Sequence, residues 1–282
     1  MELLFRVFSQ FPLWLLHALG AGMGWVVYGL SSGYRRRWNA NRAQAGLTAA
    51  QVRGAIAHNG RMIFELPRLW LGKPVPYRWQ NLEVVQRAYE RKKGIVFLTP
   101  HMGCFEITAQ AMAETYHQQY GDLTVLYRPA RQAWLADMMK HVRNRPGLKT
   151  APTTLAGVRQ MIKALRKGEA VGLLPDHVPP EGQGVWVPFF NKPAYTMTLA
   201  AKLAQQTGAA VVWVWGERLP HGAGFLLHCG EIEEALPEDL EQAAARINQE
   251  MESIILSDPN QYMWSYARYR SPRPQPAQED NA

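Results

Sequence analysis

Residues 95–110 read IVFLTPHMGCFEITAQ. The apolar run at 95–99 is rich in β-branched residues and predicts a buried strand that ends at Pro100. His101 follows at once, and Glu106 stands where the pattern predicts the start of a helix. Polar residues just beyond the carboxyl end of a buried strand are typical of the sites of open α/β sheets. The stretch therefore predicts an α/β fold with a His101–Glu106 pair at one edge of its sheet.

This pair suits proton transfer. A carboxylate beside an imidazole fixes its tautomer and stabilises the imidazolium, so that His101 can take a proton from a substrate hydroxyl. The bland interpretation is a turn or core histidine, because a His-x-x-x-x-Glu spacing also occurs by chance. Cys104, between the two residues, is interpreted as packing.

The rest of the chain alternates strands with helices, which predicts a mixed, largely parallel central sheet covered by helices. Further strands are predicted at 123–127, 170–174, 209–215 and 225–232, and helices at 48–71, 82–93, 106–116, 134–142, 153–167, 200–206 and 238–256. No second domain boundary is visible, so one domain is expected over 34–271. The Pro-, Gln- and acid-rich tail at 272–282 is predicted to be disordered.

The N-terminal region predicts a membrane element at 1–33. Residues 11–30 carry no formal charge, and their length matches the ~30 Å of a bilayer's hydrocarbon core. Arg35, Arg36, Arg37 and Arg42 follow directly, which by the positive-inside tendency keeps the rest of the chain in the cytoplasm. A signal peptide would carry its basic residues before the apolar stretch. A buried helix remains an alternative, and whether the anchor spans the bilayer or lies in its interface stays open.

Composition points the same way. The 282 residues carry a formal charge of +8, which suits nucleic acid, anionic lipid or an acidic protein. No nucleic-acid-binding motif is present, whereas ten Trp and eleven Tyr favour a membrane interface. Two cysteines without metal-ligand spacing fit a reducing compartment.

Four ordered blocks carry a resemblance to a known family. They are 95–110, quoted above; LYRPARQAWLADMMKHVRNRPG at 126–147; the segment 164–212 with its LLPDHVPPEGQG and VPFFNKPA; and DPNQYMWSYARYRSPRP at 258–274. Together they resemble the bacterial lipid A late acyltransferases, within the wider His-x-x-x-x-Asp/Glu glycerolipid acyltransferase group. The similarity covers nearly the whole chain.

The resemblance implies an acyltransferase at the cytoplasmic face of the inner membrane. The donor would be an acyl carrier protein thioester, and the acceptor would be a hydroxyl of a lipid A precursor. His101 would be the general base and Glu106 its orienting partner, without a metal or redox cofactor and without nucleic acid as a partner. Two alternatives are a different amphiphilic acceptor, such as a lysophospholipid, ornithine lipid or glycolipid, and a catalytically decayed lipid-binding protein. Intact His101 and Glu106 argue against decay.

Arginines are the expected ligands for negative charge. Arg128 ends the strand 123–127, as His101 ends its own strand, and a guanidinium there can bind phosphate or the tetrahedral oxyanion. Arg143 and Arg145 are rivals for that function, and a solvated basic helix face is the bland alternative.

Asp176 occupies a third strand end, in the block that the resemblance assigns to the acceptor side of the site. This chain departs from the family's Pro-Asp-Gln-Asp pattern, since His177 and Val178 follow Asp176. It also carries Tyr266 and Ala267 where relatives commonly have His and Arg.

Overall fold

The central element is a seven-stranded sheet, as expected from the predicted fold class. The computed structural model describes residues 2–127, 132, 138–139 and 145–273. The strand order is β1-β9-β8-β2-β5-β3-β4, and every neighbouring pair is parallel except β8–β9. The strands are β1 (Tyr77–Gln80), β2 (Ile95–Leu98), β3 (Leu123–Tyr127), β4 (Leu148–Pro152), β5 (Ala170–Leu173), β8 (Ala210–Arg218) and β9 (Phe225–Glu231).

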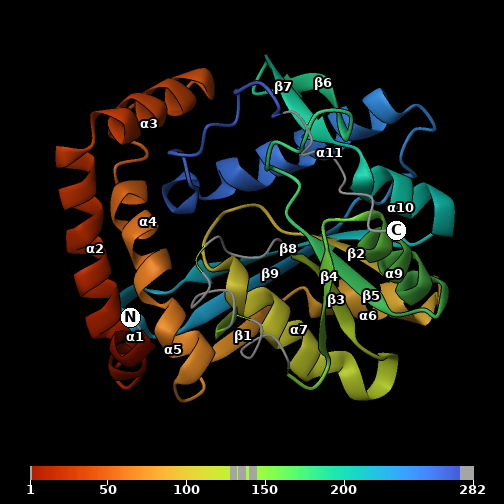
Figure 1. Ribbon diagram of the computed structural model, residues 1–282, viewed down its shortest axis with the longest axis horizontal. Coiled ribbons are helices and arrows are strands. Elements are labelled where there is room, and N and C mark those ends of the chain that lie inside the picture. Colours follow the sequence, from red (N-terminus) through yellow and green to blue (C-terminus); the bar gives the residue numbers. More distant parts are fainter. Residues whose placement is uncertain (1, 128–131, 133–137, 140–144, 274–282) are drawn as a thin grey trace.

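Helices cover both faces of this sheet (Figure 1). Packed against one face are α6 (Leu82–Glu90) and α7 (Phe105–Tyr120), and against the other α9 (Leu155–Arg166), α10 (Leu199–Thr207) and α11 (Leu240–Ser257). The alternation of side chains along β2 explains both layers. Ile95 and Phe97 pack with α6 and α7, whereas Val96 and Leu98 pack with α9, α10 and α11. A strand buried on both faces is apolar throughout, as this one is.

An N-terminal helical layer lies beside the sheet (Figure 1). It contains α1 (Glu2–Ser9), α2 (Leu13–Leu30), α3 (Ser32–Gln44), α4 (Gly54–Phe64) and α5 (Leu66–Leu71). Glycines let α2 and α4 touch through their backbones, because a Cβ on Gly60 would lie 1.9 Å from the carbonyl oxygen of Gly20. Likewise a Cβ on Gly24 would lie 2.2 Å from the carbonyl oxygen of Ile56. Two of the four glycines in α2, Gly20 and Gly24, therefore serve helix packing.

The predicted strands and most predicted helices are confirmed, with shifted ends. The helix predicted at 48–71 is wrong in one respect, because it is two helices, α4 and α5, separated at Glu65 and with Pro67 in the first turn of α5. The arginine cluster after the apolar stretch forms a helix of its own, α3. The helix predicted at 134–142 and the tail at 272–282 lie largely outside the described residues.

Strands that the sequence did not reveal are at the sheet's edges or outside it. The edge strands β1 and β4 are half exposed, so their sequences show little apolar pattern. The hairpin β6 (Gly184–Phe189) and β7 (Lys192–Met197) forms a separate two-stranded sheet. Its turn residues Phe190 and Asn191 both have positive φ, 47° and 58°, which is the backbone of a type I′ turn.

Candidate active site

His101 and Asp176 form a buried pair at the carboxyl edge of the sheet. Each lies three residues beyond the last residue of its strand, and the parallel register pairs those two strand ends, Leu98 with Leu173. The Nδ1 of His101 lies 2.7 Å from Asp176 Oδ1, and the backbone N–H of His101 donates to Oδ2 at 2.9 Å. One carboxylate therefore binds both the ring and the backbone of the same histidine.

The electrostatics of this pair define the proton positions. Burial by itself raises the pKa of Asp176. The charge of His101 and its hydrogen bonds outweigh burial and hold this pKa well below its usual range. An ionised carboxylate only accepts hydrogen bonds, so the Nδ1–H of His101 donates a hydrogen bond to Asp176. In the neutral form of the ring, this leaves the lone pair on Nε2, which is the arrangement that a general base needs.

The sequence prediction gave the orienting role to Glu106. In the structure, Asp176 binds the ring nitrogen Nδ1. The reason is topological, since Asp176 ends the strand next to that of His101, while Glu106 lies beyond a turn in the first turn of α7. Glu106 is buried there, 7% exposed, and its catalytic role stays a prediction.

Glu106 also lines a cavity of about 70 Å³ between α7 and the sheet. The cavity wall is mostly apolar and includes Phe97, Ala109, Met112 and Gly172.

His177 and Tyr266 build an aromatic wall beside His101. The ring of His177 stacks on that of His101 with centroids 3.8 Å apart, and Tyr266 lies 4.7 Å from His177. The Tyr266 hydroxyl accepts a hydrogen bond from the Val178 N–H at 3.0 Å. Burial and then the charge of His101 lower the pKa of His177 to about 4, so His177 is neutral at neutral pH. The two positions where this chain departs from the family pattern are thus in contact.

The C-terminal block holds the chain around His101. The Met263 N–H donates to the carbonyl of His101 at 3.0 Å, and the Gly103 N–H donates to the carbonyl of Gln261 at 2.9 Å. Met102 and Tyr262 form an isolated antiparallel bridge between these contacts. Sequence reasoning located this block by resemblance, but it did not predict that the block braces the histidine.

Of the three candidate arginines, one is in the described part of the chain. Arg145 donates to Gln110 Oε1 at 3.1 Å and to the carbonyls of Leu69 and Trp70 at 2.9 and 2.7 Å, so it bridges α5 and α7. Burial lowers its pKa and the nearby Glu106 opposes that shift. Arg128 and Arg143 lie outside the described residues, and the anion-binding roles of all three stay predictions.

Sequence comparison decides the family. Residues 3–271 match the model of the family described as bacterial lipid A biosynthesis acyltransferase. The chain belongs to this family. The prediction from the four sequence blocks is confirmed.

Curated relatives agree with the family. The chain is 31% identical over 202 residues to the lipid A biosynthesis lauroyltransferase of Escherichia coli (strain K12), which covers 69% of this chain and 63% of that protein. It is 26% identical over 195 residues to the palmitoleoyltransferase of the same organism, covering 68% and 61% of the two chains. A lipid A biosynthesis acyltransferase of Haemophilus influenzae is 26% identical over 276 residues, covering 92% and 86%. The match thus spans less than two thirds of the two E. coli proteins.

Within the family, three of the four blocks converge in space. The strand end of the first block, the Asp176 turn of the third and the C-terminal block all meet around His101. The second block contributes β3, whose last residue directly precedes Arg128. The convergence explains why blocks so far apart in the chain form one signature.

Proposed function

We propose that this protein is a membrane-associated acyltransferase that moves a fatty acyl chain from an acyl carrier protein thioester to a hydroxyl of a lipid A precursor. The observation that carries the proposal is the His101–Asp176 pair, which lies within the part of the chain that matches the family. The pair fits a reaction whose nucleophile is a substrate hydroxyl, since such a hydroxyl needs a base to deprotonate it.

His101 acts first, as the base. Its Nε2 takes the proton of the acceptor hydroxyl while the hydroxyl oxygen attacks the thioester carbonyl carbon. Asp176 stabilises the imidazolium that results, because its carboxylate lies against Nδ1. The tetrahedral intermediate collapses with cleavage of the carbon–sulfur bond, and the proton on Nε2 passes to the departing thiolate. The ester product and the free thiol balance the reaction without a further reactant.

Negative charge on the intermediate needs donors nearby. Helix α7 begins at Phe105, and the N-terminus of a 16-residue helix carries positive partial charge and free N–H groups. Arg128 directly follows β3, two strands from β2 in the same sheet. We assign oxyanion or phosphate binding to this edge of the sheet, with Arg128 as the first candidate.

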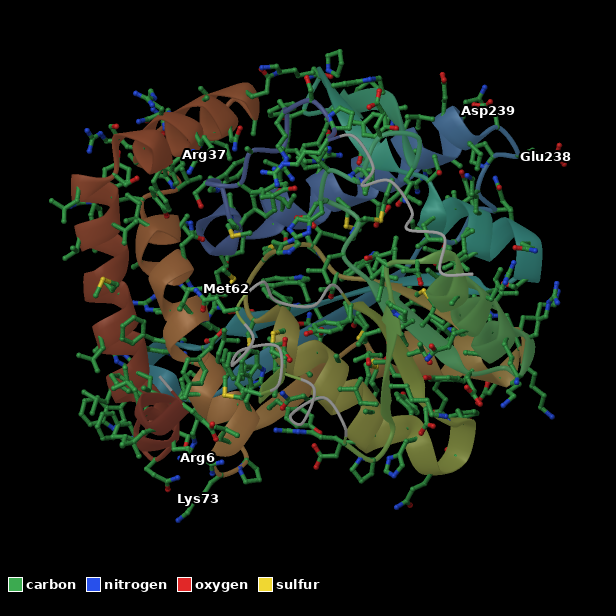
Figure 2. All side chains as sticks on the ribbon, in the orientation of Figure 1. Arg6, Arg37, Met62, Lys73, Glu238 and Asp239 are labelled. Atoms are coloured by element: carbon green, nitrogen blue, oxygen red, sulfur yellow. The ribbon has the colours of Figure 1, made fainter. Side chains whose placement is uncertain are left out.

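Membrane association is supported by the outer face of the N-terminal layer. Among the described helices, α2 is long and apolar enough to cross a membrane by length and composition. Its exposed large apolar side chains are Trp14, Leu19, Met23, Trp25, Val26, Val27 and Leu30. Basic residues flank this layer in Figure 2, with Arg37 near one end and Arg6 and Lys73 near the other, whereas Glu238 and Asp239 lie on the opposite side of the molecule. An apolar face with basic flanks fits an anionic bilayer surface.

The packing of α2 favours a position in the interface over a spanning one. Gly20 and Gly24 place α2 directly against α4. His17, on the same buried stripe, bonds to Glu65 inside the domain. If α2 spanned the bilayer, it would carry His17 and its partner Glu65 to the depth of the hydrocarbon, where charged side chains are costly. We therefore place α2 along the bilayer surface, with its exposed apolar face in the acyl boundary.

Mass spectrometry of lipid A tests the function. A strain that lacks the gene should accumulate lipid A without one secondary acyl chain, and restoration of the wild-type gene should return that chain, whereas the His101→Ala variant should not. Unchanged lipid A with an altered phospholipid or ornithine lipid profile would move the acceptor to another amphiphile. Full complementation by His101→Ala would contradict the catalytic proposal and favour a lipid-binding protein.

A further inference from the structure

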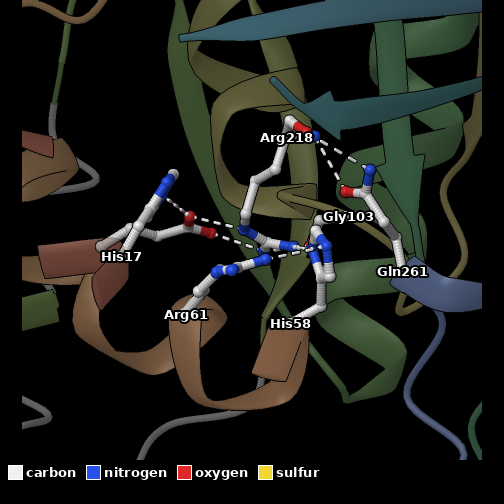
Figure 3. A network of polar contacts seen from close by, with 7 residues as sticks. His17, His58, Arg61, Gly103, Arg218 and Gln261 are labelled. Atoms are coloured by element: carbon white, nitrogen blue, oxygen red, sulfur yellow. Dashed lines mark hydrogen bonds and ion pairs between the residues drawn. The ribbon is translucent and has the colours of Figure 1, made fainter. Parts of the chain in front are cut away.

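A second buried cluster of charged residues lies between the N-terminal layer and the sheet (Figure 3). Arg218, the last residue of β8, donates from Nε and Nη2 to the two carboxylate oxygens of Glu65, both at 2.7 Å. His17 of α2 lies 3.0 Å from the same carboxylate, with Nε2 towards Oε2. All three residues are buried, with exposures of 6% or less. The cluster joins α2, the break between α4 and α5, and the sheet.

Arg218 also binds the turn that follows His101. Its Nη2 donates to the carbonyl oxygen of Gly103, and its backbone N–H donates to Gln261 Oε1 at 2.8 Å. Gln261 in turn accepts the Gly103 N–H through its own carbonyl at 2.9 Å. Both polar backbone groups of Gly103 are therefore bound, one by Arg218 and one by Gln261. Figure 3 shows the contacts between Gln261 and Arg218.

The turn itself is tightly packed. Gly103 has φ 54°, and a Cβ there would lie 2.0 Å from the carbonyl oxygen of Gly216 on β8. The Cys104 N–H donates to that same carbonyl at 2.7 Å. The turn separates His101 from α7 by only three residues, so its position sets both the ring and the N-terminus of the helix.

We propose that Arg218 is a positioning residue for His101, held in place by Glu65 and His17. A planar guanidinium can bind a carboxylate with two nitrogens and still donate to a carbonyl, which a lysine ammonium cannot do in the same geometry. A buried ion pair is by itself a poor means of stabilisation, because desolvation offsets the attraction. The function of this pair is to fix the turn, and α2 is thereby part of the support of the active site. The inference rests on the proposed function in taking His101 as the base.

The Arg218→Lys variant tests this inference, with Arg91→Lys as the matched control. Arg91 also pairs with a glutamate, Glu231 at 2.6 Å, but at the exposed opposite end of the sheet. We expect Arg218→Lys to lower kcat by roughly 10–100-fold, as changes in supporting residues commonly do, with KM within a few-fold. Amide hydrogen exchange in the segment 102–107 should become about tenfold faster or more, because the turn opens locally. Arg91→Lys should change neither quantity.

A double variant separates positioning from stability. Replacement of both charges in Glu65→Met/Arg218→Met removes the buried ion pair as a unit, which commonly recovers stability that a single replacement loses. We expect thermal stability to recover in the double variant while kcat stays low, since nothing then binds the Gly103 carbonyl. Should Arg218→Lys fail to fold, this double variant decides alone.

The outcomes are distinct. Wild-type kcat in Arg218→Lys, unchanged exchange at 102–107, or recovery of kcat together with stability in the double variant would each overturn the inference. The exchange measurement needs no substrate, so it tests the turn even if the acceptor is not a lipid A precursor. Failure of wild-type transfer would concern the proposed function alone.

Discussion

The described residues include two buried histidine–carboxylate pairs that look alike and differ in charge balance. His101 and Asp176 approach to 2.7 Å at the edge of the sheet, and His17 and Glu65 to 3.0 Å beside the N-terminal layer. Glu65 also receives two bonds from Arg218. Asp176 forms its ion pair with His101 and none with an arginine in the described part of the chain.

We infer that this difference separates the proposed catalytic pair from a supporting one. Burial raises the pKa of Glu65, but the charge of Arg218 and the hydrogen bonds from His17 and Arg218 together lower it to about 2. Glu65 thus shares its charge between a guanidinium and an imidazole. The charge of Asp176 is instead available to the ring of His101.

The largest expected effect contrasts the two histidines. His101→Ala should lower the rate of acyl transfer by ~10²–10⁴, the usual loss for a general base. His17→Gln should stay within about tenfold of wild type, because the amide can still donate to Glu65. Initial rates of the purified variants, with circular dichroism to check folding, measure both. Equal losses in the two variants would erase the distinction between the pairs.

The carboxylates come next. Asp176→Asn should lower kcat by ~10–100-fold or more, as loss of an orienting partner does. It should also move the acid limb of the kcat/KM–pH profile to lower pH, because the protonated ring loses its counter-charge. Glu106→Gln is the matched amide variant. If Glu106 acts away from Nδ1, Glu106→Gln should lower kcat without shifting the acid limb of the pH profile. A shift in Glu106→Gln but not in Asp176→Asn would instead favour Glu106 as the orienting partner of His101.

Two arginines extend the comparison to the substrate. Arg128→Ala should lower kcat/KM by about tenfold or more if it binds phosphate or the oxyanion, and Arg128→Lys should rescue only part, since the planar fork is lost. Arg145→Ala should chiefly lower the melting temperature, because Arg145 binds the Leu69 and Trp70 carbonyls. Normal kinetics for Arg128→Ala with a collapse for Arg145→Ala or Arg143→Ala would transfer the anion site to the latter residues.

Acid should destabilise the protein through the buried cluster around Arg218. Burial, followed by the charge of Arg218, lowers the pKa of His58 beside Arg218 from 6.5 to about 3. The unfolded chain therefore binds a proton between pH 6.5 and 3 that the native state does not, so stability rises with pH across that window. The depressed pKa of Glu65 acts in the same sense from about pH 4.5 to 2. Melting temperatures from pH 7 to 4 should fall steadily, and His58→Gln should fall less; an equal slope in that variant would exclude His58 as a source.

The smallest expected effect concerns membrane binding by the N-terminal helical layer. Arg36 is exposed on α3, the helix that follows α2. Its replacement by Gln should weaken binding to anionic vesicles by about fivefold, from ~1 kcal/mol per basic residue near the surface. Lys202→Gln on α10 is the control, exposed on another part of the molecule. Vesicle sedimentation at two salt concentrations measures the binding of both variants. Equal weakening of vesicle binding in the two variants would contradict a membrane-binding face at α2 and α3.

Much of the fold followed from local patterns. The buried strands at 95–98, 123–127 and 170–173 and the Thr154-capped helix α9 are short-range signals of periodicity and capping. The edge strands β1 and β4 were not predicted, because half-exposed strands carry little apolar pattern. The positions of His101, Arg128 and Asp176 at strand ends were also evident from sequence, because each follows directly on an apolar run.

Which of these strand ends meet was decided by the tertiary structure alone. The sequence determined that His101 and Asp176 each end a buried strand, and the family blocks determined what kind of protein carries them. Only the order of the sheet, with β5 beside β2, brought Asp176 to the ring nitrogen Nδ1 of His101. Only folding joined Glu65 to Arg218, which are 153 residues apart in the chain. Periodicity reports the neighbours of a residue along its own element, whereas contacts between elements depend on strand order and packing, which no local pattern encodes.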